Sequence, residues 1–164
     1  MKTKTLLGIS CAAILSVGLT ACASNDGDPS KGTVDRMTLE KRSDLTQICI
    51  PEPTRRIQLR VSDTQIIEAF TKSLQRKNIK AEFYRGSEIP EHCKYILAYS
   101  LKGKSDVILK AKMTVREKGE EGTTAIGQSY YVNTRGDVRK KSMEIGFDGQ
   151  VDEMIEELFK NYWL

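Results

Sequence analysis

The strongest constraint on the fold is an alternation of side chains along residues 106–118. Successive side chains of an extended chain point to opposite faces, so such a segment has one apolar and one polar side. The two sets are Leu109, Ala111, Met113 and Val115 against Lys110, Lys112, Thr114 and Arg116. The pattern predicts a strand with one face in a core and the other in solvent, as is common in antiparallel sheets.

Other segments predict the remaining elements of one domain. Residues 62–65 have the spacing of a capping box, and apolar residues of 64–77 lie on one helical face, which indicates a helix that ends at Asn78. A second helix follows a cap at Asp148 or Gly149. Residues 55–61 alternate and predict either a short strand or an extended linker. Further strands are expected at residues 48–50, 79–84, 95–101 and 123–134.

The order of these elements predicts the fold class. Strand, helix, four strands and helix (β-α-β-β-β-β-α) indicate an α+β domain. We expect an antiparallel or mixed sheet of four to five strands, with Gly103-Lys104 and Glu121-Gly122 in its turns. Both helices are expected to pack on one face of this sheet.

The N-terminus has the organisation of an export signal. Lys2 and Lys4 precede an apolar run at residues 5–20, after which the chain becomes polar. A membrane-spanning helix needs about 20 apolar residues, and this run is shorter and contains Ser10, Ser16 and Gly18. It is therefore predicted to be cleaved.

The segment Leu19-Thr20-Ala21-Cys22 resembles the lipobox of bacterial lipoproteins. The resemblance implies a signal peptide at residues 1–21 and lipidation of Cys22. The polar composition of the residues that follow indicates a flexible tether at 22–43, before a single periplasmic domain at 44–164. Two or more acyl chains would anchor the protein stably. The alternative is an ordinary secretory signal followed by an incidental cysteine.

The two residues after the cysteine bear on the destination. By resemblance to Gram-negative lipoprotein sorting, Ala23 and Ser24 imply the outer membrane, with the domain facing the periplasm. The periplasmic leaflet of the inner membrane and the cell surface are the alternatives.

Charge argues against a nucleic-acid partner. The chain has 164 residues, with 26 basic and 22 acidic side chains. Removal of residues 1–21 takes away only Lys2 and Lys4, which leaves the mature chain nearly balanced. Nucleic-acid binding normally requires a clustered basic footprint.

The four cysteines are distinguished by their positions. Cys11 lies in the signal and Cys22 is the lipidation site, which leaves Cys49 and Cys93. In an oxidising compartment a disulfide is the default for such a pair. The alternatives are two buried thiols or a metal site. Because the chain has no Cys-x-x-Cys and a single histidine, zinc lacks its usual ligands, and we expect no metal and no cofactor.

No catalytic signature is present. His92 is the only histidine, and a Cys–His dyad with Cys93 would require a free thiolate within its reach. Because neighbours in an extended segment point to opposite sides, we interpret His92 as an exposed loop residue. No phosphate-binding glycine loop and no Gly-x-Ser-x-Gly occur.

The basic side of the alternating strand is the candidate binding face. Lys110, Lys112 and Arg116 point one way, with Lys118 as a further candidate, and Arg139-Lys140-Lys141 is expected in a loop beyond the sheet. Such a face could contact anionic lipid, lipopolysaccharide or an acidic envelope protein. The alternative is ordinary surface charge that also protects against strand pairing.

The domain also resembles known lipoproteins. Ile48-Cys49-Ile50, the amphipathic helix and Cys93 before residues 95–101 resemble a family of small, uncharacterised proteobacterial lipoproteins, which implies no activity. At the level of fold, the order of helices and strands also resembles that of the lipoprotein of the lipopolysaccharide translocon and of the lipoprotein activators of peptidoglycan synthases.

These features together predict a non-enzymatic lipoprotein of the outer membrane whose domain binds a partner in the envelope. An envelope enzyme or enzyme inhibitor, and a purely structural surface lipoprotein, are the alternatives. The sequence leaves the oligomeric state open.

Overall fold

A computed structural model describes residues 37–54, 59–133 and 136–162. The expected signal peptide and the lipidation site Cys22 lie outside these residues, as do residues 55–58 of the expected strand or linker. Within the described segments, neither helix is both long and apolar enough to cross a bilayer.

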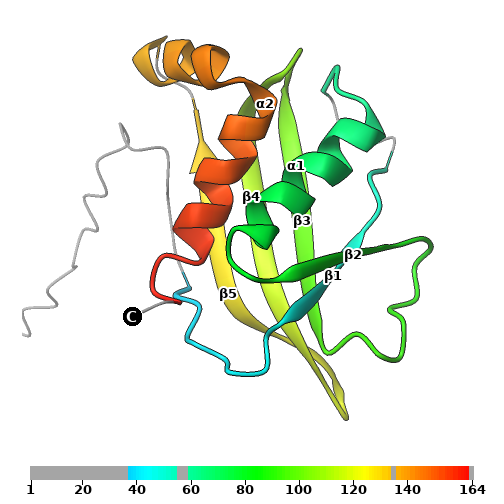
Figure 1. Cartoon of the computed structure of the whole chain (residues 1–164). Coiled ribbons are helices and arrows are strands. Elements are labelled where there is room, and N and C mark those ends of the chain that lie inside the picture. The colour runs from blue at the N-terminus through cyan, green and yellow to red at the C-terminus, as the bar shows by residue number, and fades with distance from the viewer. Residues whose placement is uncertain (1–36, 55–58, 134–135, 163–164) are drawn as a thin grey trace, which may run out of the picture.

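The predicted α+β fold and its order of elements are confirmed (Figure 1). The elements are β1 (Gln47–Pro51), α1 (Asp63–Gln75), β2 (Lys80–Tyr84), β3 (Tyr95–Lys104), β4 (Val107–Gly119), β5 (Gly122–Val132) and α2 (Gly136–Leu158). The five strands form one sheet in the order β2-β1-β3-β4-β5. The sheet is mixed, since β1 runs parallel to both β2 and β3 while β3, β4 and β5 are antiparallel. A parallel pair needs a long crossover connection, and α1 provides it between β1 and β2.

Helix α1 begins at the predicted capping box and ends at Gln75, shortly before the predicted stop at Asn78. The Ser62 hydroxyl accepts a hydrogen bond from the backbone N–H of Gln65 at 3.1 Å, which caps the first turn. Asn78 has a φ of 55°, a left-handed conformation that asparagine tolerates better than most residues. The buried face of α1 consists of Ile66, Ala69, Phe70, Ser73 and Leu74.

The β3–β4 hairpin differs from the predicted pattern at one point. The turn is at Ser105 and Asp106, and β3 continues through the expected turn residues Gly103 and Lys104. An irregularity in the register between Lys102 and Gly103 then inserts one extra residue into β4. Ile108 consequently occupies the core position that alternation assigned to Leu109, and Leu109 is only half-buried.

Helix α2 begins earlier than the sequence predicts. Gly146 has a φ of 69° and interrupts the helical conformation, so that α2 consists of two segments joined at a kink. The segment after the kink contains the predicted apolar face. Arg139, Lys140 and Lys141, which we expected in a loop, lie in the segment before it.

Both helices pack on the same face of the sheet, as predicted (Figure 1). Their apolar residues meet the inward side chains of the central strands, including Leu97 and Leu101 of β3 and Met113 and Val115 of β4. Residues 37–43, which we expected in the tether, are folded against the sheet. Met37 pairs with Gln128 at the edge of β5, and the side chain of Leu39 is buried in the core.

Candidate functional site: the open face of the sheet

The face of the sheet opposite the helices carries a row of exposed basic side chains. Lys110, Lys112 and Arg116 project from β4, as the alternation predicts, and all three are exposed. Lys102 of β3 is also exposed and pairs directly with Lys110. We call these four residues the basic face.

The Lys102–Lys110 pair places two cations opposite each other on adjacent strands. Like charges at such a position destabilise a sheet, because the Cβ atoms of directly paired residues are only about 5 Å apart. Among the described residues, no carboxylate forms an ion pair with any member of the basic face. Lys112 instead lies 5.1 Å from the centre of the Tyr130 ring. The charge of this face is therefore not neutralised within the described fold.

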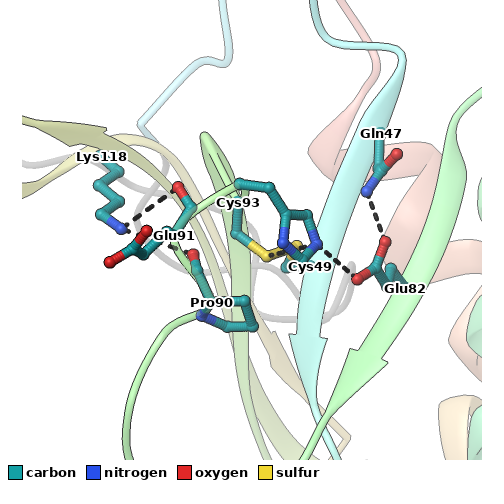
Figure 2. Close-up of a disulfide and its surroundings, with 8 residues drawn as sticks. Gln47, Cys49, Glu82, Pro90, Glu91, Cys93 and Lys118 are labelled. Carbon is teal, nitrogen blue, oxygen red and sulfur yellow. Dashed lines mark hydrogen bonds and ion pairs between the residues drawn. A yellow bond between two sulfur atoms is a disulfide. The ribbon is translucent and has the colours of Figure 1, made fainter.

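Two other residues on this side of β4 are not available as exposed contacts. Thr114 is buried, and its hydroxyl lies 3.4 Å from Oε1 of Gln128. The amine of Lys118, the further candidate, lies 3.5 Å from the backbone oxygens of both Pro90 and Glu91 (Figure 2). Lys118 thus ties β4 to the segment before β3.

The predicted pair Cys49–Cys93 is a disulfide (Figure 2), and it lies in the same row across the sheet as Arg116. Cys49 of β1 is in register with Ile96 of β3, which in turn pairs with Arg116 of β4. The bond joins cysteines 44 positions apart. Closing a loop of that length stabilises the native state by about 4 kcal/mol in the chain-entropy account. Both cysteines are buried.

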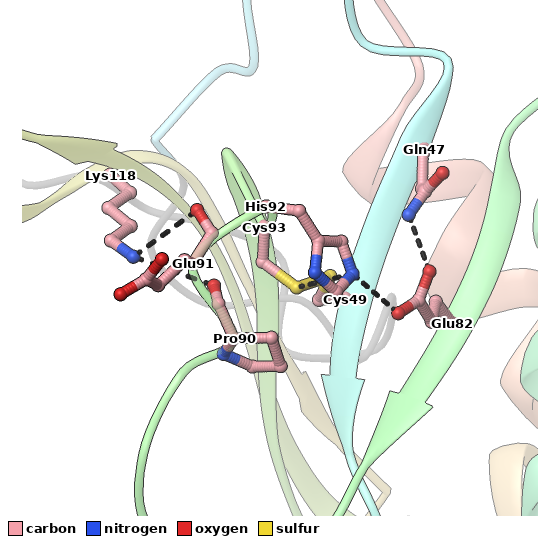
Figure 3. A network of polar contacts seen from close by, with 8 residues as sticks. All are labelled: Gln47, Cys49, Glu82, Pro90, Glu91, His92, Cys93 and Lys118. Carbon is pink, nitrogen blue, oxygen red and sulfur yellow. Dashed lines mark hydrogen bonds and ion pairs between the residues drawn. A yellow bond between two sulfur atoms is a disulfide. The ribbon is translucent and has the colours of Figure 1, made fainter.

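His92 is exposed, as predicted, but its ring does not point away from Cys93. Its Nε2 atom is 3.8 Å from Sγ of Cys93 and 2.6 Å from Oε1 of Glu82 (Figure 3). Glu82 lies on β2 in register with Cys49, which explains how a residue distant in sequence reaches the disulfide. The amide of Gln47 donates a hydrogen bond of 2.6 Å to the second oxygen of Glu82.

A hollow of about 280 Å³ adjoins this network, and its lining includes Cys49, His92, Cys93 and Tyr95. Asp44, which also contributes, accepts hydrogen bonds from the Lys94 amine and the Tyr95 hydroxyl. These bonds stabilise the carboxylate and lower the pKa of Asp44 to about 2, with the bond from Lys94 as the largest cause. Asp44 in turn raises the pKa of Lys94.

The geometry limits the chemistry of this cluster in the oxidised state. A Cys–His dyad needs a free thiolate, and Cys93 is bonded to Cys49. His92 contacts one carboxylate, that of Glu82. The cluster is therefore a disulfide with an adjoining hydrogen-bond network, and the four exposed cations are the distinct feature beside it.

Sequence reasoning missed three residues of the open face: Lys102, Glu82 and Gln47. Lys102 could have been found, because Tyr95, Leu97, Tyr99 and Leu101 alternate on β3 and place Lys102 on the opposite side. Glu82 and Gln47 reach their positions only through the parallel pairing of β1 and β2. Nothing local in the sequence indicates that pairing.

Comparisons with known proteins add a likeness in fold. No protein-family model matches the chain, and no curated protein sequence is significantly similar to it. The solved PelC dodecamer from Paraburkholderia phytofirmans is similar in structure, with a TM-score of 0.50 and 12% sequence identity, over 79% of this chain and 98% of that one. A point variant of the same protein gives a TM-score of 0.48 at 12% identity, over 80% and 96%. At this identity the likeness shows the fold alone.

Proposed function

We propose that this protein is a non-catalytic lipoprotein of the outer membrane, anchored through Cys22, whose domain binds an anionic partner in the cell envelope. The binding surface is the basic face. Its partner is an acidic envelope protein or an anionic headgroup layer, and the contact depends on charge complementarity.

The observation that carries the proposal is the uncompensated charge of the basic face. Some basic side chains elsewhere on the domain are paired with acids, as in Lys77–Glu156 between the turn after α1 and α2, and in Lys141–Glu153 within α2. The basic face instead gathers four exposed cations on two adjacent strands, and it includes a cross-strand pair of lysines that opposes folding. An anionic partner would turn this repulsion into a favourable contact.

Crosslinking in intact envelopes tests the basic face. The native protein is compared with a variant that carries Lys110→Glu, Lys112→Glu and Arg116→Glu. A control with Arg139→Glu, Lys140→Glu and Lys160→Glu has the same change in net charge, on exposed residues of α2 and the turn that follows it. We expect the first variant to lose partners that the native protein and the control retain. Identical sets of partners for all three proteins would remove the basic face from the proposal.

The anchor is tested separately. Cys22→Ala removes the sulfur that would receive the lipid, so the protein should leave the membrane fraction and lack the acyl mass of the native product. A mature protein that starts at Met1, or a Cys22→Ala variant that fractionates like the native protein, would contradict the anchor but leave the basic face untouched.

A further inference from the structure

The four side chains beside the hollow form a ligand set that the proposed partner binding does not use. Sγ of Cys49, Sγ of Cys93, Nε2 of His92 and a carboxylate oxygen of Glu82 all lie within 4.8 Å of one another. We propose that the reduced form of this cluster binds one zinc ion, with two thiolates, one imidazole and one carboxylate as ligands. The proposal is independent of the basic face.

The spacing of the ligand atoms suits a tetrahedral site. Zinc–ligand bonds of about 2.0–2.3 Å in a tetrahedron place neighbouring ligand atoms about 3.3–3.8 Å apart. Nε2 of His92 already lies 3.8 Å from Sγ of Cys93. The 2.6 Å contact between His92 and Glu82 is a hydrogen bond, and it would lengthen as the metal replaces the shared proton. Once the disulfide is reduced, its two sulfur atoms would also separate to this spacing.

The surroundings orient the ligands as in known zinc sites. Metal ligands are commonly held by a hydrogen bond from a neighbouring group, and loss of that group weakens metal binding about 10- to 100-fold. Gln47 donates to Oε2 of Glu82 and leaves Oε1 directed at His92 (Figure 3). Cys49 and Glu82 lie on paired strands, so the sheet fixes their separation. The hollow lined by Cys49, His92 and Cys93 provides a path for the ion.

The oxidation state of the cysteines controls this site. In the disulfide, neither sulfur is a thiolate, and His92 and Glu82 are left as the two remaining ligands. A dithiol reductant transfers two electrons and two protons to the disulfide, which yields two thiols while the reductant becomes a disulfide. Zinc then displaces both thiol protons as it binds, because thiolates are the ligand form of cysteine. Reoxidation would expel the metal.

Zinc titration of the full lipidated chain in detergent tests the proposal. The protein is reduced with a phosphine, freed of excess reagent without oxygen, and titrated with Zn²⁺ against a chromophoric chelator. We expect one equivalent to bind at least about 100-fold more tightly than to the oxidised protein. Co²⁺ as a substitute should give the visible absorption of a tetrahedral thiolate site.

Variants identify the ligands. His92→Ala and Glu82→Gln, in the reduced protein, should each lower zinc affinity by at least about tenfold, and Gln47→Ala should lower it about 10- to 100-fold. Glu91→Gln changes the exposed acid next to His92 and is the matched control, with affinity expected to stay unchanged. Equal affinity in all four variants would mean that the thiols alone bind zinc, which would overturn the proposed site.

Circular dichroism separates binding from loss of fold. The reduced chain should keep the spectrum of the oxidised chain, or regain it when Zn²⁺ is added. A reduced chain that stays unfolded with zinc present would overturn the proposal. Equal zinc binding by the oxidised and reduced proteins would do the same.

Discussion

Gln150 shows how one polar side chain fixes the position of a helix. It is fully buried in α2, and its carbonyl oxygen accepts a hydrogen bond of 2.8 Å from the backbone N–H of Ile108. Its amide donates to the backbone oxygens of Asp106 and Gly146. A single residue thus joins the kink of α2 to the β3–β4 turn. It also gives a hydrogen-bond partner to the buried N–H of Ile108, beside the irregular part of β4.

We predict that Gln150→Leu destabilises the domain by about 1–3 kcal/mol, because the N–H of Ile108 would lose its partner in a buried setting. The measurement is urea unfolding followed by circular dichroism. Gln75→Leu replaces an exposed glutamine at the end of α1 and serves as the control. Equal midpoints for the Gln150→Leu and native proteins would show that the three hydrogen bonds have no net effect.

Asp44 gives the domain a predictable acid response. Its pKa is lowered from 3.8 to about 2 in the folded state, chiefly by the hydrogen bond from Lys94. A lowered folded-state pKa stabilises the fold above the unfolded value, and this contribution is lost as the pH falls through the folded value. Asp44 therefore contributes fully above pH 4 and loses its contribution between about pH 4 and pH 2.

We predict that Asp44→Asn removes this part of the pH dependence. The native protein should be more stable than the variant at neutral pH, and the two should converge as the pH falls from about 4 to about 2. Urea unfolding at a series of pH values measures the difference in free energy of unfolding between the two proteins. A difference that stays constant across this range would contradict the assignment. The effect will be modest, since Asp44 is exposed.

At the scale of elements, β4 combines two opposite demands. Its inward side chains join the core beneath α2, while its outward side chains concentrate positive charge. The extra residue at Leu109 allows β4 to meet both demands, because it places Ile108 in the core and still leaves Lys110 on the open face. The strand is thus a structural centre on one side and the proposed binding surface on the other.

We predict that Lys110→Glu stabilises the domain by about 0.2–1 kcal/mol while it weakens partner binding. The introduced carboxylate would face Lys102 across the strands and replace repulsion with attraction. Thermal unfolding at low ionic strength measures the first effect, and the crosslinking comparison measures the second. Lys140→Glu, on α2, is the control for net charge. A destabilised Lys110→Glu variant would show that the two lysines do not repel each other in the folded protein.

At the scale of the whole molecule, the folded unit reaches further towards the N-terminus than the sequence indicates. Leu39 is buried against Gly127 of β5, where a Cβ atom on the glycine would lie only 2.8 Å from Cβ of Leu39. The bridge between Met37 and Gln128 precedes it. The segment that would lead to the lipid anchor is therefore joined to the edge of the sheet at β5, which fixes where the proposed tether leaves the domain.

We predict that Leu39→Ala lowers the free energy of unfolding by about 2–5 kcal/mol, the range for truncation of a buried leucine. Met37→Ala is the matched control, because the Met37 side chain is exposed while its backbone makes the bridge to Gln128. Chemical denaturation measures the free energy of unfolding of both variants. If Leu39→Ala unfolds at the same denaturant concentration as the native protein, residues 37–43 are a tether as first expected.

The sequence by itself determined the kinds and order of the elements, the disulfide pair and the outward direction of Lys110, Lys112 and Arg116. These depend on local periodicity, on capping residues such as Ser62 and on the number of cysteines left after the signal. The tertiary structure decided the parallel pairing of β1 with β2 and β3, the extra residue in β4 and the kink of α2. It also decided the positions of Glu82 and Gln47 beside the disulfide, and the burial of Leu39. The physical reason is that each of these depends on which distant segments pair and pack, and no pattern within a single segment specifies its partner.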